Sequence, residues 1–166
     1  MISLRSMSPL RKGVLALAAV ALVVGLVWDR SPASELTIPP WPAGVGEADE
    51  YPFGVGIMLR DQRAWKPVFK ALAERYGGKY RLREIHLTLD AKADVGAVRS
   101  HFDEEMINRR HWRAETQETG RPRTWTHGYE SSDGRDVFML VGIEPLPGET
   151  LVPLNILTTI PMIPGR

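Results

Sequence analysis

The feature that most constrains this chain is an uncharged apolar stretch close to its N-terminus. Residues 13–28 read GVLALAAVALVVGLVW and follow directly on the basic pair Arg11–Lys12. Basic residues before an apolar run at the start of a chain are typical of export signals and signal anchors. The positive side stays in the cytoplasm. We therefore predict a cytoplasmic segment over 1–12, a membrane-directed helix over 13–28, and an exported remainder.

The length of this stretch is compatible with either a membrane anchor or a cleaved signal peptide. Its sixteen residues lie between the roughly 7–15 of a signal peptide and the about 20 of a spanning helix. Trp28 suits a bilayer interface and favours an anchor, whereas Ser31-Pro32-Ala33 offers a small-x-small cleavage site. We expect a single-pass cell-membrane protein with its domain outside, and the alternative is a secreted or periplasmic domain after cleavage. A buried helix of a globular protein fits the basic-then-apolar order poorly.

A proline-rich segment comes next. Five prolines and two glycines lie between residues 31 and 52. Proline at this density disfavours helix and central strand, and it favours an extended spacer. We predict a stalk over 29–52 and an exported domain over 53–166. The alternative, a proline-rich ligand around residues 38–42, needs reader domains that are not expected outside the cytoplasm.

Composition narrows the classes of function. The chain has no cysteine, which excludes disulfides, thiolate metal sites and cysteine nucleophiles. Its 21 basic and 20 acidic residues nearly balance, so no overall positive field attracts nucleic acid. We therefore expect no nucleic-acid partner, and a domain that is stable through its core alone.

Hydropathy periodicity predicts the first elements of the domain. Apolar residues alternate over 53–59 and predict a strand. A helical stripe follows, which begins at Asp61 or at Pro67. It ends at Gly77–Gly78. Later elements are a strand, a helix that begins after the cap Asp94, three further strands and a C-terminal strand: 80–90, 94–110, 111–118, 124–131, 136–143 and 151–160.

This β-α-β-α-β-β-β order with a C-terminal strand predicts an α+β fold. We expect a mainly antiparallel sheet with the two helices on one face. The Asp133-Gly134 pair predicts a hairpin between two of the strands. Pro153 predicts that Leu151–Ile160 lies at a sheet edge, where it would invite pairing with a strand of a partner protein.

A further pattern spans residues 85–143, carried by Phe102, Asp103, Met106 and Trp112. It resembles that of small secreted or membrane-tethered bacterial domains, in which a helix with F-Y-x-x-x-L leads through G-W into a strand meander. Here Asp103 replaces the Tyr and His111 replaces the Gly. Such domains are mostly of unknown function, so the resemblance implies fold and envelope location and carries over no catalytic residue.

The candidate ligand-binding residues are Trp125, His127 and Tyr129, which alternate along one face of a predicted strand. If exposed, they would form an aromatic platform for a sugar or peptide. If that face is turned inward, they belong to the core. The residues Glu84, His86 and Thr88 would line a second surface if the other side of the sheet is open.

Catalytic and metal-binding patterns are weak. His111 and His127 lie on neighbouring predicted strands, but a metal site would need Glu130 or Asp103 as a third ligand and no spacing supports it. We predict no catalytic residue, metal or cofactor. The first hypothesis is a non-enzymatic, membrane-tethered envelope protein that binds a protein partner through Leu151–Ile160 or acts as an accessory subunit. The alternative is a small periplasmic domain that binds a glycan, lipid or peptide.

Overall fold

The computed structural model describes residues 37–47, 50–78, 81–117 and 119–161. The predicted cytoplasmic segment and membrane-directed helix, residues 1–28, lie outside these ranges. Within them, no helix combines the length and the apolar character needed to cross a bilayer.

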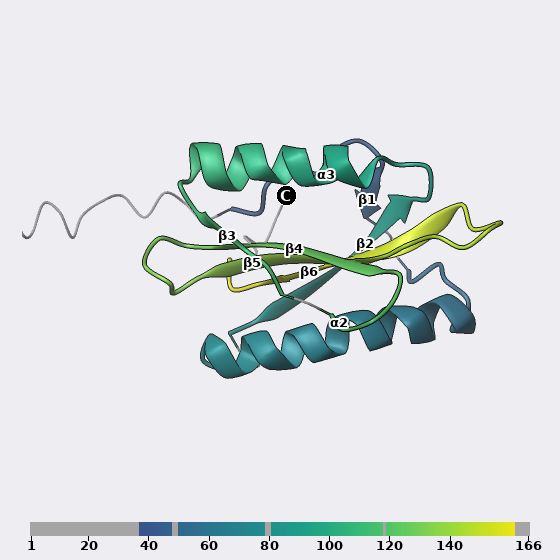
Figure 1. Cartoon of the computed structure of the whole chain (residues 1–166), viewed down its shortest axis with the longest axis horizontal. Coiled ribbons are helices and arrows are strands. Elements are labelled where there is room, and N and C mark those ends of the chain that lie inside the picture. The colour runs from purple at the N-terminus through teal and green to yellow at the C-terminus, as the bar shows by residue number, and fades with distance from the viewer. Residues whose placement is uncertain (1–36, 48–49, 79–80, 118, 162–166) are drawn as a thin grey trace, which may run out of the picture. The chain divides into compact units, whose positions relative to one another are not determined.

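A six-stranded sheet with the order β1-β2-β6-β5-β4-β3 forms the centre of the domain (Figure 1). Every neighbouring pair of strands is antiparallel. The α+β class and the antiparallel sheet are therefore confirmed. The elements are β1 (Val45–Glu47), α2 (Val55–Arg75), β2 (Arg83–Asp90), α3 (Val95–Asp103), a π-helical segment η2 (Glu104–Arg109), β3 (Arg113–Glu115), β4 (Thr124–Glu130), β5 (Val137–Ile143) and β6 (Leu151–Thr158).

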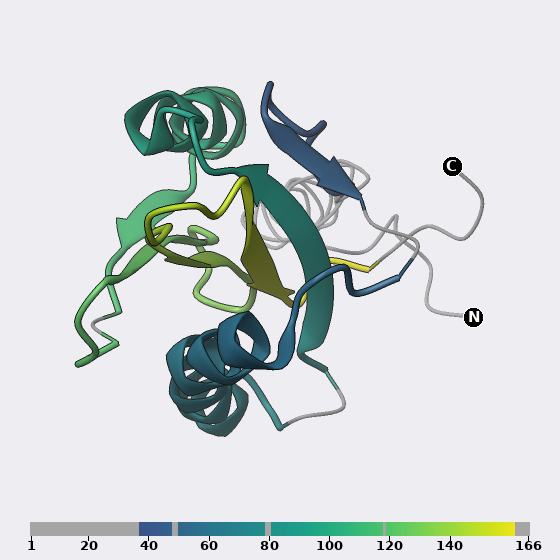
Figure 2. The same cartoon turned by 90° about the vertical axis from the view of Figure 1, so that its right-hand side faces the viewer.

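The two helices lie on opposite faces of the sheet (Figure 1 and Figure 2), so the prediction that they share one face is wrong. On one face, Tyr129 donates a hydrogen bond to Asp103 of α3. On the other face, Asn155 donates one to Asp61 of α2. The physical reason lies in the two central strands. β5 and β6 read as nearly continuous apolar runs and are buried along nearly their whole length, which requires cover on both sides.

The predicted strand over 53–59 is wrong, because these residues lead into α2 and form its first turns. The buried residues Asp61, Ala64, Val68 and Leu72 recur at helical spacing and fix the inner face of the helix. Pro67 lies inside the helix, neither at its start nor in its first turn. Pro67 is exposed. Water can therefore solvate the carbonyl one turn earlier in the helix, which receives no hydrogen bond because proline has no backbone N–H.

Residues 37–47, which were assigned to the stalk, pack against the domain. Arg110 donates a hydrogen bond to the carbonyl of Thr37 at 2.7 Å, and a ring nitrogen of His101 lies 2.9 Å from the carbonyl of Pro40. β1 then pairs with the outer edge of β2. The folded domain therefore begins well before residue 53.

β6 is a central strand, so its predicted edge position is wrong. It pairs with β2 over Leu151–Thr158 and with β5 from Leu154 onward. Pro153 lies just before the stretch that pairs with β5, where its missing N–H costs no ladder bond on that side. The backbone of β6 is occupied on both sides, so any protein partner must use another surface.

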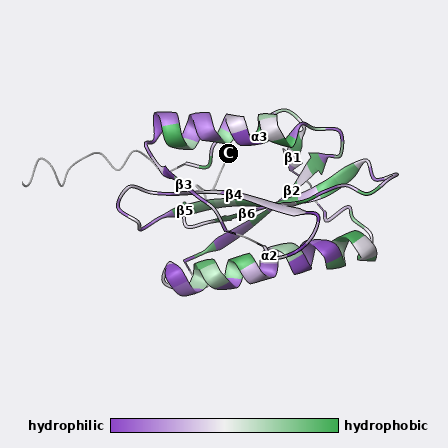
Figure 3. Cartoon of the chain, in the orientation of Figure 1, coloured by the Kyte–Doolittle hydropathy of each residue, from purple (hydrophilic) through white to green (hydrophobic). Residues whose placement is uncertain are grey.

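Two predictions that rest on short sequence motifs, the β4–β5 hairpin and the Asp94 helix cap, are confirmed. The hairpin of β4 and β5 has the expected register, with Glu130 opposite Val137. Asp94 caps α3 by accepting a hydrogen bond from the backbone N–H of Gly96 at 2.7 Å. Both helices carry hydrophilic and hydrophobic residues in alternating bands (Figure 3), as expected of helices that cover a sheet.

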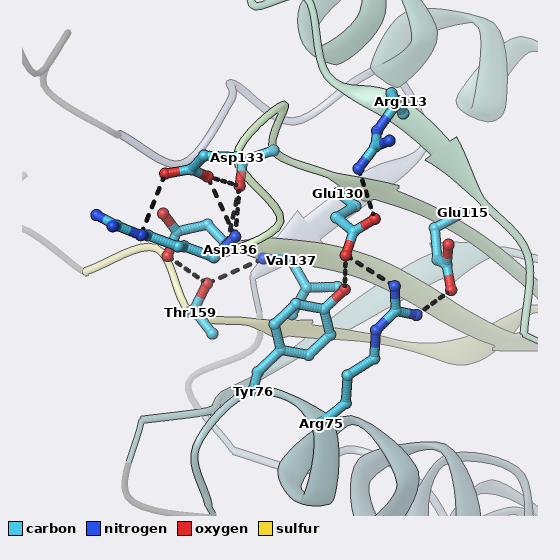
Figure 4. A network of polar contacts seen from close by, with 11 residues as sticks. Arg75, Tyr76, Arg113, Glu115, Glu130, Asp133, Asp136, Val137 and Thr159 are labelled. Carbon is cyan, nitrogen blue, oxygen red and sulfur yellow. Dashed lines mark hydrogen bonds and ion pairs between the residues drawn. The ribbon is translucent and has the colours of Figure 1, made fainter.

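A cluster of charges joins the end of α2 to β3 and β4 (Figure 4). The buried carboxylate of Glu130 accepts hydrogen bonds from Tyr76 at 2.9 Å, Arg75 at 2.8 Å and Arg113 at 3.2 Å. Arg75 also donates to the more exposed Glu115 at 2.6 Å. Because Glu130 receives three donors, it anchors the C-terminal turn of α2 to the sheet.

We predict that Glu130→Ala lowers the free energy of unfolding by about 1–3 kcal/mol, since it leaves the buried hydroxyl of Tyr76 without an acceptor. Glu115→Ala removes a carboxylate from the same arginine at a more exposed position and should cost less than about 1 kcal/mol. Urea unfolding of both variants measures this difference. Equal losses would show that Glu130 does not anchor the helix.

Candidate functional site

A cavity of about 470 Å³ lies beside Trp125, between α3 and the loop that joins β3 to β4. It opens where the N-terminal end of β4 meets the middle of α3. The residues that line it are Arg99, Thr116, Gln117, Thr119, Gly120, Arg121, Pro122, Thr124, Trp125 and Thr126. We call it the Trp125 pocket. Its lining joins one large aromatic ring to two cations and several hydroxyl groups.

Trp125 is held flat against the sheet by the residue opposite it. Its partner across the ladder is Gly142 on β5. A Cβ atom at position 142 would collide with the indole ring, so only glycine lets the ring lie over β5. The tryptophan is 9% exposed, and its indole N–H is buried without a hydrogen-bond acceptor among the described residues.

Arg99 covers the other side of this ring. Its guanidinium carbon lies 5.0 Å from the centre of the Trp125 ring, within the range of a cation–π contact. The side chain comes from the middle of α3, and its position there follows from the burial of Val98 and Phe102 on either side. Trp125 is thus enclosed between the backbone of β5 and a cation.

The pocket wall is braced by hydroxyl groups. Thr124 donates a hydrogen bond to the carbonyl of Arg121 at 2.7 Å, and the backbone N–H of Arg121 donates to the hydroxyl of Thr119 at 3.2 Å. Thr126 donates to the carbonyl of Gln117. These bonds shape the loop around the pocket and hold its polar groups in place.

The structure separates the three predicted binding residues. Trp125 lines the pocket, whereas Tyr129 is fully buried below α3. His127 and Tyr129 both donate to Asp103, with Nε2 of His127 at 2.8 Å and the Tyr129 hydroxyl at 3.0 Å. Burial, and then the bond to Asp103, raise the pKa of Tyr129, which keeps its hydroxyl protonated as a donor. These two residues tie α3 to β4 and do not form a platform.

The alternative metal site is not formed. Asp103 and His127 do meet, but across the described residues no three His, Cys, Asp or Glu side chains are arranged to hold a metal ion. His111 lies just after η2, with a positive φ of 58°. That left-handed conformation suits glycine best, the residue that the resembling pattern has at this place.

A second polar cluster, which the sequence did not reveal, crosses the opposite face of the sheet. Buried Asp61 accepts hydrogen bonds from Asn155 at 2.6 Å and from Tyr51 at 3.0 Å. The side-chain oxygen of Asn155 lies 2.7 Å from Nδ1 of His86. Because the Asn155 amide donates to Asp61, its oxygen faces His86, so Nδ1 must carry a proton. α2 covers this face over Asp61 and Asn155, whereas Glu84 and Thr88 are partly buried and His86 is exposed at the margin. The three residues therefore do not form one open surface.

The outer end of this cluster reaches solvent at His86, whose side chain is 49% exposed, whereas that of Glu84 is 21% exposed. Nε2 of His86 lies 3.1 Å from a carboxylate oxygen of Glu84, within ion-pair distance but not aligned as a hydrogen bond. Burial raises the pKa of Asp61, against the hydrogen bonds from Asn155 and Tyr51, which lower it. Burial likewise raises the pKa of Glu84. Asp61, Asn155 and His86 line neither the Trp125 pocket nor the cavity at the start of α2, so we assign the buried pair Asp61 and Asn155 to the core.

Comparison with known proteins gives no relative from which a role could be transferred. No protein-family model matches the chain, and no curated protein or solved structure is significantly similar to it. Any functional conclusion therefore depends on the geometry of the domain itself.

We predict that Asp61→Asn changes how stability depends on pH. The folded pKa of Asp61 is raised above its ordinary value of 3.8. The stability linked to this proton is therefore complete below the unfolded pKa and is lost as pH rises through the folded pKa. The variant lacks this loss, so its unfolding free energy relative to the native chain should increase with pH.

Urea unfolding between about pH 4 and pH 7 measures this difference. Asp90→Asn, at an exposed aspartate of β2, controls for the change of residue type. A difference between Asp61→Asn and the native chain that does not vary with pH would contradict the prediction.

Proposed function

We propose that this protein is a non-enzymatic binding domain of the cell envelope and that its ligand site is the Trp125 pocket. The observation that carries the proposal is an open pocket, braced by hydrogen bonds, next to a nearly buried tryptophan. Its volume of about 470 Å³ lies within the roughly 300–1,000 Å³ of small-molecule sites. Its polar walls, beside the small exposed part of the indole ring, suit a small polar ligand such as a sugar.

The chemistry of the lining supports binding rather than catalysis. The described residues around the cavity offer hydroxyl, amide and guanidinium groups. None of these groups exchanges protons readily near neutral pH, as a general acid or base must. They can hold and orient a ligand through hydrogen bonds and charge.

The envelope location is supported by the N-terminal sequence. The order of basic residues and then an uncharged apolar run over 13–28 is typical of a signal anchor, with a cleaved signal as the alternative. We propose that the domain lies outside the cytoplasm, tethered through this segment. A domain without cysteine is stable there without disulfides.

A second candidate function, binding of a partner protein, is favoured by a different observation. The large apolar side chains that are most exposed among the described residues are Tyr51, Val55, Leu59 and Leu151. Tyr51, Val55 and Leu59 lie at or just before the start of α2 and Leu151 begins β6. The ion pair of Arg60 and Glu149 joins these two segments. An exposed apolar corner with a charged neighbour is typical of a protein interface.

The ligand proposal predicts a loss of response in Trp125→Phe. The full-length protein in detergent micelles is titrated with glycans, lipids and peptides, and tryptophan emission and binding heat are recorded. We expect one class to change the emission of the native chain and of Trp65→Phe, a matched change on α2 at the opposite face. Trp125→Phe should lose the emission change. No response to any class, or an unaltered response in Trp125→Phe, would overturn the proposal.

The partner proposal predicts that Leu59→Glu breaks a membrane complex. The tagged protein is extracted from its native membranes in mild detergent, and the native mass of the complex is measured. We expect a stoichiometric partner with the native chain and its loss with Leu59→Glu, whereas Arg63→Glu, one turn further along α2, tests charge reversal alone. Recovery of the native chain by itself would count against this second function.

A further inference from the structure

Arg99 is a partly buried arginine that has no acidic partner among the described residues. Arg60, Arg75, Arg81, Arg109, Arg113 and Arg135 each form an ion pair with a carboxylate. Arg99 forms none with any residue in the described ranges, although it is half-buried. Its Nε–H is fully buried and meets no acceptor there. Buried donors of this kind are rare in folded proteins and call for an explanation.

The nearest carboxylate along α3 is already engaged elsewhere. Asp103 is one turn further on, the spacing at which an acid usually pairs with an arginine. Its side chain instead accepts hydrogen bonds from His127 and Tyr129. These two donors hold Asp103 against β4, and the guanidinium of Arg99 faces the Trp125 pocket without a counter-charge.

The remainder of the pocket adds to its positive character. Arg121 stands on the wall, and no described lining residue carries a carboxylate. Arg121 has no ion-pair partner in the part of the chain that the structure covers either. A pocket with two guanidinium groups that have no carboxylate partner among the described residues favours an oxyanion, because arginine binds carboxylate and phosphate in a two-pronged geometry.

We infer that the ligand of the Trp125 pocket carries a carboxylate or a phosphate, which Arg99 binds while the rest of the ligand packs beside the indole ring. This inference rests on the proposed ligand-binding function and names the ligand class. Carboxylate and phosphate share the chemistry that arginine recognises, and matched ligands distinguish them.

The test uses three ligands with the same sugar ring: glucose, glucuronate and glucose 6-phosphate, with inorganic phosphate as the bare anion. Binding to the full-length protein in detergent is measured by calorimetry. We expect at least one anionic ligand to bind about tenfold or more tightly than glucose. Preference for glucuronate identifies a carboxylate site, and preference for glucose 6-phosphate identifies a phosphate site.

Two variants at position 99 locate the interaction. Arg99→Gln should remove the preference for the anionic ligand, and Arg99→Lys should retain part of it, because lysine keeps the charge but loses the planar fork. Arg63→Gln, at an exposed arginine of α2, is the matched control and should bind like the native chain. Circular dichroism checks that each variant is folded.

The outcomes of these experiments distinguish the inference of an anionic ligand from the proposed ligand-binding function on which it rests. Glucose binding as tightly as both charged analogues, with loss in Trp125→Phe, would overturn the inference and leave the binding function intact. Failure of all anionic probes to bind at millimolar concentration would also overturn the inference. The titration with glycans, lipids and peptides would then still test the ligand-binding function. An anion preference that survives in Arg99→Gln would overturn the role of Arg99.

Discussion

One buried hydrogen bond, from Asn155 on the central strand to Asp61 on α2, fixes how that helix lies on the sheet. Burying a carboxylate is costly unless hydrogen bonds compensate it. The helix can therefore settle only where Asp61 meets Asn155 and Tyr51. With that point set, the other end of α2 brings Arg75 and Tyr76 to Glu130. These two polar contacts, one near each end of α2, allow the helix only one alignment on the otherwise apolar face of the sheet.

Local elements could be predicted from the sequence because their signals lie within a few residues. The β4–β5 hairpin follows from Asp133-Gly134, and the start of α3 follows from Asp94. The start of α2 could not be predicted in this way, because Val55 and Leu59 are exposed and only imitate the alternation of a strand. The central place of β6 was also missed, since Pro153 is tolerated just outside the stretch that pairs with β5. An available signal was Asn155, a polar residue within an apolar run.

In the candidate site, too, one residue could be predicted from a local pattern and the others only from tertiary contacts. Trp125 could be singled out from its place in an aromatic alternation, but its neighbours Arg99 and Gly142 lie far from it in the sequence. Gly142 becomes informative only when the register sets it opposite Trp125. Arg99 is recognised as lacking a partner only when the structure shows that Asp103 accepts hydrogen bonds from His127 and Tyr129. Both relations depend on tertiary contacts that periodicity does not encode.

The short first strand has a consequence for where this domain can be cut. β1 and β3, the two edge strands, are each three residues long, whereas β2 beneath β1 has eight residues. Short edges resist unwanted pairing between molecules. A protease that removed residues before 53 would uncover the long β2 edge. The released fragment would then be prone to self-association, because β1 covers this edge of β2 in the intact domain.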